Sequence, residues 1–303
     1  MSASQIPPEL QPIGAIGLGI MGAPMNRNLL AAGADVQVWA RRPETAEALA
    51  QDGAHPCASL AELVRSVRVL VLNVSDTPDV EALMLGPDGI LEHARPGLLV
   101  IDHSTIDPMR TRAIARAAAE REVTFVDAPV SGGEPGARAG TLSLMVGGPV
   151  DVVERLRPIF EVVGSTLTHV GDSGAGQIAK ACNQLVVGET LVAIGEAFAL
   201  AEQTGVDPAR MREALMGGFA GSRILEVHGQ RLLDGDFEPG FQTGLYHKDL
   251  GIVAGLGEAV GLSLDGLMPV RRAVDEALEA GQADHDVAIL ARFCLHARDD
   301  QGR

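Results

Sequence analysis

Short apolar runs alternate with helical stretches through the first 170 residues, and this alternation is the strongest constraint on the fold. Six runs rich in Val, Ile and Leu are strand candidates: IGAIGLG (13–19), ADVQVWA (34–40), VRVLVLNV (67–74), GLLVIDHS (97–104), VTFVDAPV (123–130) and TLSLMVGG (141–148). Continuous apolar runs separated by helices are typical of a parallel sheet that is buried on both faces. The pattern therefore predicts an α/β fold with a doubly wound Rossmann domain over residues 13–172.

The pattern changes after residue 172. Residues 177–204 are apolar at helical spacing and contain no proline, which predicts one long helix of about 40 Å at 1.5 Å per residue. Shorter helical stretches follow it, and strand signals are scarce. The sequence thus predicts an all-helical second domain over residues 173–303, led by the long interdomain helix, and a short flexible arm over residues 1–12.

The charge and the cysteine pattern exclude several classes of partner. A formal net charge of -16 disfavours nucleic acid and anionic membranes, but local cations still allow a small anionic ligand. No apolar run approaches the roughly 18 residues of a membrane span, and the first residues lack the features of a signal peptide. Cys57, Cys182 and Cys294 are odd in number and lack metal-ligand spacing. We expect a cytoplasmic protein with no disulfide framework and no metal site.

A glycine motif follows the first predicted strand and opens a helix. Its six residues are Gly17, Leu18, Gly19, Ile20, Met21 and Gly22, in the pattern G-x-G-x-x-G. Glycines allow a tight turn and close approach of a pyrophosphate, while the start of the helix supplies N–H groups to the anion. An ordinary glycine-rich turn is the alternative, but the position at the first strand–helix junction favours a dinucleotide site.

The end of the second predicted strand indicates which dinucleotide is bound. An NAD site usually carries an acid here to accept from the ribose hydroxyl, but this strand ends in Ala40-Arg41-Arg42, and Asp35 comes too early. Two guanidinium groups suit a 2′-phosphate, which they can hold in a bidentate manner. We therefore expect NADP(H) in preference to NAD(H). Arg41 and Arg42 as solvated loop residues remain the alternative.

A second glycine-rich segment follows the fifth predicted strand. Ser131, Gly132 and Gly133 offer a hydroxyl and unobstructed backbone amides, a combination that suits a substrate carboxylate. Ligands of open α/β sheets bind outside the carboxyl ends of the strands. A turn that holds no ligand is an equally good interpretation of this segment alone.

Lysine is rare in this chain, and Lys180 lies on the predicted long helix. Only Lys180 and Lys248 occur among 24 basic residues. Asn183 and Gln184 fall on the same helical face as Lys180. Partial burial near the domain junction would lower the pKa of its ammonium group toward the range for proton transfer, which arginine cannot reach. Lys180 is thus a candidate acid that protonates an alkoxide, or else a lysine that extends to solvent from a partly buried helix.

Lys248 stands before Asp249 and allows two interpretations. It could close a cofactor or substrate pocket, or it could form a surface salt bridge with Asp249. The residues alone do not decide between these two roles.

Together these motifs resemble the β-hydroxyacid dehydrogenase family from about residue 12 to about residue 296. The resemblance is carried by IGLGIMGAPMNRNL (16–29), LNVSDTPDV (72–80), DHSTIDP (102–108), DAPVSGG (127–133), the GxxGxGxxxK pattern from Gly171 to Lys180, and KDL (248–250). The chain departs from the family at Asn26, at Val74-Ser75 in place of Leu-Pro, and at Gln184, where Asn is frequent. The resemblance implies a Rossmann domain, a helical domain and NAD(P)-dependent oxidation or reduction of a small hydroxy acid.

The resemblance also implies roles for individual residues. Lys180 matches the catalytic lysine of the family, and Lys248 matches a lysine that approaches the nicotinamide or the carboxylate. The implied cofactor loops contain Val74, Ser75, Ser104 and Thr105. Ser131, Gly132 and Gly133 match the segment that binds the substrate carboxylate, with Asn183 or Gln184 as a further substrate contact.

Four segments are most similar to the tartronate semialdehyde reductase branch of the family. They are DAPVSGGEPGARAGTLSLMVGG (127–148), GGFAGSRILE (217–226), DFEPGF (236–241) and ADHDVAIL (283–290). The branch implies reduction of a small aldehyde acid, and 3-hydroxyisobutyrate or threonate-type dehydrogenases are alternatives within the family. A non-catalytic NADP-binding sensor or scaffold is an alternative of another class, against which Lys180 counts. The family also implies a homodimer or homotetramer assembled through the helical domain.

Overall fold

The computed structural model describes residues 6–293, and its internal contacts divide the chain into two compact units. The first unit comprises Met1–Lys180 and the second comprises Ala181–Arg303. The sequence places the boundary at residue 172, just before the long helix, whereas the contacts divide the chain within that helix. Residues 1–5 of the expected arm and residues 294–303 of the expected second domain, with Cys294, lie outside the described residues.

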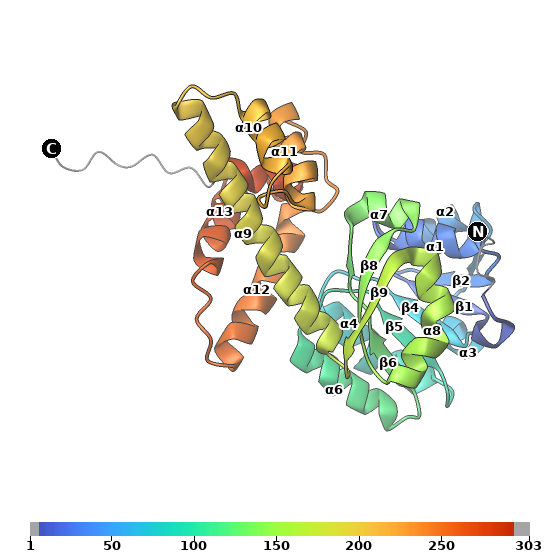
Figure 1. Ribbon diagram of the computed structural model, residues 1–303. Helices are drawn as coiled ribbons and strands as arrows, with labels where there is room; N and C mark the ends of the chain where they lie inside the picture. Colours follow the sequence, from blue (N-terminus) through green and yellow to red (C-terminus); the bar gives the residue numbers. More distant parts are fainter. Residues whose placement is uncertain (1–5, 294–303) are drawn as a thin grey trace. The chain divides into compact units, whose positions relative to one another are not determined.

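The first unit contains one sheet, which has nine strands within the described residues (Figure 1). The strands are β1 (Ile13–Ile16), β2 (Val36–Trp39), β3 (His55–Pro56), β4 (Val69–Leu72), β5 (Leu99–Asp102), β6 (Thr124–Asp127), β7 (Val130–Ser131), β8 (Leu142–Gly147) and β9 (Gly164–Gly171). Their order is β3-β2-β1-β4-β5-β6-β8-β7, and β9 pairs with β8. The chain leaves β1 toward β2 on one side and later returns to place β4 on the other. This reversal confirms the predicted doubly wound fold.

All six predicted strands form, but one edge of the sheet is not parallel. The pairs from β3 through β6 are parallel, whereas β8 runs antiparallel to β6 and β7. A parallel connection needs a crossover of a dozen or more residues, and the segment between Ser131 and Leu142 is too short for one. The expectation of a wholly parallel sheet is therefore wrong at this edge.

Both faces of the sheet are buried, as the apolar runs predict. Val69 and Val71 of β4 belong to one apolar core, and the alternate residues Leu70 and Leu72 belong to the other. The first core is completed by α1 (Gly22–Ala31), α2 (Pro43–Ala50), α7 (Gly133–Ala139) and α8 (Val150–Val163). The second is completed by α3 (Leu60–Ser66), α4 (Thr77–Leu85), α5 (Ile90–His93) and α6 (Pro108–Ala119). Each fully buried Leu or Ile contributes about 1.5–3 kcal/mol to this packing.

Residues 6–12 pack against the first unit. They include the 3-10 helix η1 (Pro8–Leu10), and the side chains of Ile6 and Leu10 are 3% and 1% exposed within the first core. The side chain of Gln11 donates to the Ile6 carbonyl at 2.9 Å and accepts from the Asp35 N–H at 2.8 Å. The prediction of a flexible arm is therefore wrong for residues 6–12, because two apolar side chains and one bridging amide fix this segment.

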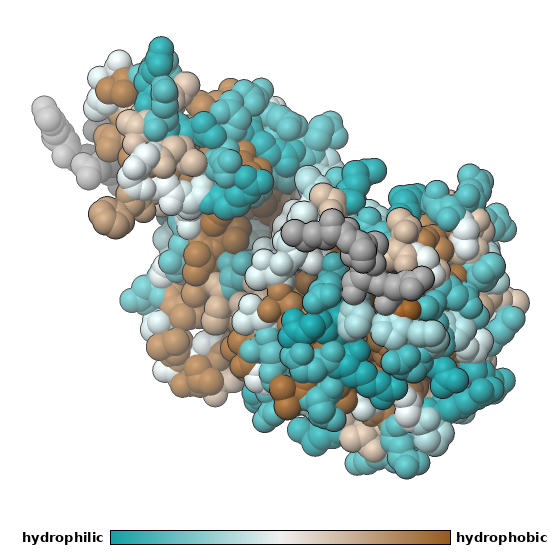
Figure 2. Space-filling model, turned by 45° about the vertical axis from the view of Figure 1, so that its right-hand side comes forward, coloured by the Kyte–Doolittle hydropathy of each residue, from teal (hydrophilic) through white to brown (hydrophobic). Residues whose placement is uncertain are grey.

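The second unit is helical throughout its described part, as the sequence predicts. It contains most of α9 (Ala175–Gln203), followed by α10 (Pro208–Met216), α11 (Arg223–Asp234), α12 (Thr243–Ala259), α13 (Leu267–Glu279), the 3-10 helix η2 (Val287–Ile289) and α14 (Leu290–Phe293). Its core surrounds Tyr246 and Val270, which are both fully buried. Figure 2 shows apolar residues gathered on the visible face of this unit, whereas hydrophilic residues cover much of the first unit.

Helix α9 meets a length and composition criterion for a membrane span. Its mean hydropathy reaches 1.5 over an 18-residue window, of which 44% is buried inside the protein. The sequence argument against a span relied on uninterrupted apolar runs, and α9 is interrupted by Lys180, Gln184 and Glu189. Core helices of soluble proteins share this length and composition.

Candidate active site

The glycine loop between β1 and α1 leaves an open space beside Gly19. Gly17 has a φ of +88°, and a Cβ atom there would lie 2.0 Å from the Asn73 carbonyl oxygen. A Cβ atom on Gly22 would lie 1.9 Å from the Gly17 carbonyl oxygen, whereas one on Gly19 would meet nothing within 4 Å. The protein's own packing thus requires glycine at positions 17 and 22. The space beside Gly19 is available to a ligand.

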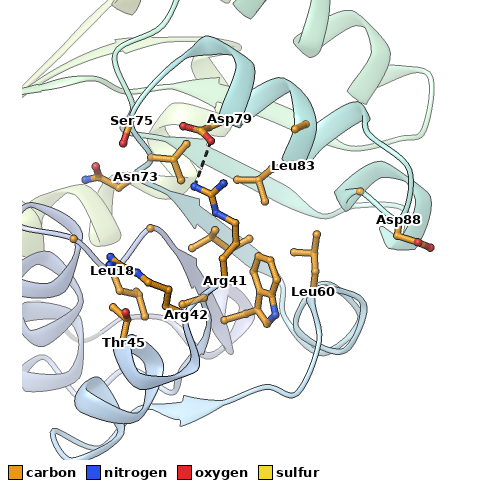
Figure 3. A pocket seen from close by; sticks show the side chains of 18 of the residues that line it. Leu18, Arg41, Arg42, Thr45, Leu60, Asn73, Ser75, Asp79, Leu83 and Asp88 are labelled. Carbon is orange, nitrogen blue, oxygen red and sulfur yellow. Dashed lines mark ion pairs between the residues drawn. The ribbon is translucent and has the colours of Figure 1, made fainter. Parts of the chain in front are cut away.

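A pocket of about 530 Å³ opens beside this loop in the first unit (Figure 3). Its walls come from the carboxyl ends of β1, β2 and β4 and the segments that follow them. Seven predicted cofactor residues line it: Gly17, Leu18, Gly19, Arg41, Arg42, Val74 and Ser75. Trp39, Leu60 and Leu83 form an apolar wall that the sequence analysis did not identify. The sequence does not distinguish these residues, because an apolar residue that lines a pocket has the same pattern as one that packs in the core.

The remaining residues of the glycine motif lie outside the pocket lining. Ile20 is 49% exposed, Met21 packs partly against the first core, and Gly22 is buried in the first turn of α1. Their positions shape the turn between β1 and α1. The first three residues of the motif thus line the pocket, and a cofactor contact by Ile20, Met21 or Gly22 stays a prediction.

The charged end of the pocket contains two bases and an acid. Arg41 and Arg42 follow β2, and Thr45 lies in the first turn of α2. Arg41 forms an ion pair with Asp79 of α4, with 3.4 Å between Nη2 and Oδ1. Asp79 lies within LNVSDTPDV (72–80), and no local pattern in the sequence indicates its role. The acid that is missing from the end of β2 is thus present on the opposite wall.

Ser104 joins the two other loops that are predicted to contact the cofactor. Its hydroxyl oxygen accepts the Val74 N–H at 2.9 Å, and its own N–H donates to the Asp102 carboxylate at 3.0 Å. Ser104 is 2% exposed, whereas Thr105 is half-buried. Next to them, burial lowers the pKa of His103 to about 4, and its Nδ1 lies 2.7 Å from the Ala128 carbonyl oxygen. Ser104 therefore fixes the loop after β4 against the loop after β5.

Asp127 and Gln177 anchor the first turn of α9. The Asp127 carboxylate accepts N–H groups from Gly174 at 2.7 Å and Gln177 at 3.1 Å. The Gln177 side chain donates to the Ser104 carbonyl at 2.7 Å and accepts from the Ile106 N–H at 3.1 Å. Burial raises the pKa of Asp127 to about 6, although these backbone N–H groups lower it. Sequence reasoning missed both roles, because the partners lie about fifty residues or more apart along the chain.

Ser131, Gly132 and Gly133 form the turn from β7 into α7. Gly132 and Gly133 have φ values of +137° and +62°, a succession that side chains other than glycine rarely adopt. Gly132 is exposed, and Ser131 and Gly133 are half-buried. The turn therefore presents a hydroxyl and backbone amides at the surface, as a carboxylate site requires.

Lys180 is 7% exposed, one helical turn after Gln177 on α9. The turn that carries it is fixed to the sheet through Asp127 and Gln177. Its burial makes the alternative of a lysine that extends to solvent inapplicable. The structure thus supplies the buried, well-supported position that the sequence argument required for a proton donor.

Asn183, Gln184 and Lys248 belong to a polar network within the second unit. The Asn183 amide donates to Gln184 Oε1 at 2.7 Å, and Gln184 Nε2 donates to Asp249 Oδ2 at 2.7 Å. Asp249 Oδ1 lies 2.9 Å from Lys248 Nζ, and the Tyr246 hydroxyl donates to the Gln184 carbonyl at 2.7 Å. The salt bridge considered for Lys248 is present, but Asp249 is 2% exposed, so it is not a surface pair.

The polar groups of the first unit define the chemistry that the site can support. They are backbone amides at glycines, two guanidinium groups, hydroxyls and the buried Lys180. Within residues 6–293, no group of three or more His, Cys, Asp or Glu side chains could hold a metal ion. The residues present suit an anionic nucleotide and a carboxylate, and an ammonium group can exchange a proton with a nearby oxygen.

Family models match both parts of the chain. Residues 12–171 match the NAD binding domain of 6-phosphogluconate dehydrogenase. Residues 174–294 match a domain described as NAD-binding of NADP-dependent 3-hydroxyisobutyrate dehydrogenase. The boundary between the two matches falls just before α9, close to the boundary predicted from the sequence.

Individual relatives are similar over nearly their full length. The 2-hydroxy-3-oxopropionate reductase of Escherichia coli (strain K12) is 41% identical over 281 residues, which cover 92% of this chain and 96% of that protein. The 3-hydroxyisobutyrate dehydrogenase of Pseudomonas aeruginosa is 39% identical over 297 residues, which cover 95% and 93%. The solved structure of Mycobacterium tuberculosis 3-hydroxyisobutyrate dehydrogenase with L-serine has a TM-score of 0.86 at 33% identity, covering 92% of this chain and 97% of that one.

Proposed function

The chain belongs to the β-hydroxyacid dehydrogenase family, and from this premise we propose that it reduces 2-hydroxy-3-oxopropionate (tartronate semialdehyde) to glycerate with NADPH. Family membership itself makes it an NAD(P)-dependent oxidoreductase that acts on the CH–OH group of a hydroxy acid. The substrate and the preference for NADPH are the proposal. The 41% identical reductase and the four similar sequence segments support this substrate.

The first part of the proposal concerns the cofactor. The space beside Gly19 accommodates the pyrophosphate, and Arg41 with Arg42 binds the 2′-phosphate at the end of the pocket. Val74, Ser75, Ser104 and Thr105 belong to the loops that face the nicotinamide side in the family. Lys248 stays a predicted cofactor contact, and its ammonium group is paired with Asp249.

The second part concerns the substrate and the proton. Ser131, Gly132 and Gly133 would hold the carboxylate, and Lys180 would donate a proton to the aldehyde oxygen. The nicotinamide cofactor, when bound, would supply the hydride. One aldehyde, one hydride and one proton give one primary alcohol. Reversal returns the proton to Lys180, so the same group serves oxidation.

Between the two candidate amides, we assign the substrate contact to Asn183. The amide oxygen and nitrogen of Gln184 are already engaged by Asn183 and Asp249. Gln184 therefore acts as a positioning residue, which holds the Asn183 side chain. Asn183 is half-buried on the face of α9 that Lys180 shares.

The burial of Lys180 is the observation that carries the proposal. A chain with two lysines among 24 basic residues keeps one of them 7% exposed on a helix turn fixed by Asp127. Lys180→Met keeps the unbranched shape and most of the length of the side chain, and it removes the titratable amine. We expect kcat to fall about 10²- to 10⁴-fold, with NADPH binding retained by fluorescence titration. Wild-type turnover in this variant would remove Lys180 from the reaction.

The substrate is tested by comparing kcat/KM for a panel of acids. The panel contains 2-hydroxy-3-oxopropionate, glycerate, 3-hydroxyisobutyrate, L-serine and threonate, each with NADP(H) and NAD(H). The proposed substrate should give the highest value. A higher value for 3-hydroxyisobutyrate would favour the second candidate, which the 39% identical dehydrogenase supports. Turnover of none of these acids would reject both candidate substrates.

Two further expectations concern the protein's environment. We infer a homodimer or homotetramer through the helical unit, where Leu200, Val260 and Met268 are each more than 60% exposed. Sedimentation of the purified protein tests this assembly. A cytoplasmic location, with neither nucleic acid nor membrane as a partner, stays a prediction from charge and composition.

A further inference from the structure

Asp79, Arg41 and Arg42 lie at one end of the predicted nucleotide pocket, and Asp79 forms an ion pair with Arg41. Arg41 Nη2 lies 3.4 Å from Asp79 Oδ1, and the two side chains are 78% and 30% exposed. Figure 3 shows the Arg41 side chain extended toward Asp79, whereas Arg42 lies apart, toward Leu18 and Thr45. The two guanidinium groups assigned to the 2′-phosphate therefore point to different parts of the pocket.

We propose that Asp79 sets the balance between NADP(H) and NAD(H) by opposing the 2′-phosphate at Arg41. This inference rests on the proposed assignment of Arg41 and Arg42 to that phosphate. A 2′-phosphate must share Arg41 with the Asp79 carboxylate, and the two anions repel each other across the guanidinium group. NAD(H) carries no phosphate at this position and meets no such opposition.

Asp79 can act on the bound nucleotide because it lines the pocket. It lies in the first turn of α4, directly after the loop that lines the pocket with Val74 and Ser75. An NAD-binding chain usually places its acid at the end of the second strand, but Ala40 occupies the corresponding region here. Asp88 also lines the pocket, but Asp79 is the acid that pairs with Arg41, so a 2′-phosphate bound to Arg41 meets its negative charge.

A purely structural role for Asp79 is small. An acid in the first turn of a helix is favourable, but Asp76 already caps α4 by accepting the Thr77 N–H at 2.6 Å. Asp79→Asn keeps the shape of the side chain and removes only the charge. We therefore expect the variant to fold and to keep the pocket.

The test uses nucleotide fragments and the tryptophan of the pocket. Trp39 is the sole tryptophan of the chain and lines the pocket, so its fluorescence reports binding without turnover. The probes are 2′,5′-ADP, which carries the 2′-phosphate, and 5′-AMP, which lacks it. The matched control is Asp52→Asn. Asp52 lies outside the pocket lining, and its carboxylate is 2.7 Å from the Arg27 guanidinium group.

Asp79→Asn should tighten binding of 2′,5′-ADP about threefold to tenfold at low ionic strength and leave 5′-AMP unchanged. High salt should reduce this gain, and Asp52→Asn should change neither affinity. Unchanged or weaker binding of 2′,5′-ADP to Asp79→Asn would overturn the inference, because Asp79 would then be neutral or would orient Arg41 for the phosphate.

The same titrations separate this inference from the proposed function. If the wild-type protein binds 2′,5′-ADP more tightly than 5′-AMP, the assignment of the arginines stands whatever Asp79→Asn does. If wild type and variant both bind the two probes equally, the assignment and the inference fail together. A preference that appears only in Asp79→Asn supports the inference and rejects an NADPH preference for the natural chain.

Discussion

The buried carboxylate of Asp127 makes the stability of the first unit depend on pH. Asp127 is fully buried and accepts N–H groups at the start of α9. Burial raises the pKa of this carboxyl from 3.8 to about 6, against the opposing effect of the backbone N–H groups. Asp127→Asn removes the titration and keeps the size of the side chain. Comparing Asp127→Asn with wild type therefore isolates the effect of protonating Asp127 on stability.

The sign and the size of the pH dependence of stability follow from the pKa shift of Asp127. Between pH 4 and pH 6 the folded protein keeps a proton that the unfolded chain releases, so its stability falls as the pH rises. A shift of about 2 units corresponds to about 3 kcal/mol. Asn also loses one of two acceptor oxygens, but that cost is the same at each pH. Relative to wild type, the variant should thus gain about 3 kcal/mol between pH 4 and pH 7.

Urea unfolding at a series of pH values measures this difference. Trp39 fluorescence follows the first unit, and the free energy of unfolding of the variant minus that of wild type is plotted against pH. A rising curve with its steepest part near pH 5 is expected. A flat curve would show that burial does not perturb Asp127. A falling curve would show that the hydrogen bonds from Gly174 and Gln177 outweigh burial.

Four further predictions concern the pocket and the helical unit. Replacing both Arg41 and Arg42 with Ala should raise KM for NADPH far more than KM for NADH in steady-state assays, and equal effects would reject the 2′-phosphate assignment. Gly19→Ala should fold normally by circular dichroism but bind NADPH more weakly in titrations, because its Cβ meets only the ligand space. Gly17→Ala should fail to fold, because its Cβ would lie 2.0 Å from a carbonyl oxygen; a stable variant would contradict that packing argument. Asp286→Ala should destabilise the helical unit by about 3–5 kcal/mol in urea unfolding, because the Arg231 guanidinium at 3.1 Å and the N–H groups of residues 240, 241 and 288 lose their acceptor. A loss below about 1 kcal/mol would show that water replaces the carboxylate.

The strands and the long helix were predictable because their signals are local. Apolar runs such as 67–74 and the helical spacing of 177–204 need no knowledge of distant residues. β9 was missed because its sequence, GSTLTHVG, is mostly polar and is exposed or half-buried at most positions. β3 has two exposed residues and offers no apolar run.

The chemical site was predictable where a motif carries the function and hidden where tertiary contacts carry it. Gly17, Gly19 and Lys180 stand in recognisable patterns, so the sequence identifies them as candidates. Asp79 faces Arg41 only because β2 and β4 flank β1 in the sheet. Gln177 supports the loop at Ser104 across 73 residues of chain, a relation that no local pattern contains.

The packing of residues 6–12 affects how the nucleotide-binding unit can be shortened. The family match begins at residue 12, which makes that residue a natural place to start a truncated domain. Such a truncation would delete Ile6 and Leu10, whose burial contributes about 3–6 kcal/mol together, and would strip the Gln11 bridge from Asp35. The truncated domain would expose the apolar core residues that Ile6 and Leu10 cover. It should therefore aggregate, although every residue of the matched family domain would still be present.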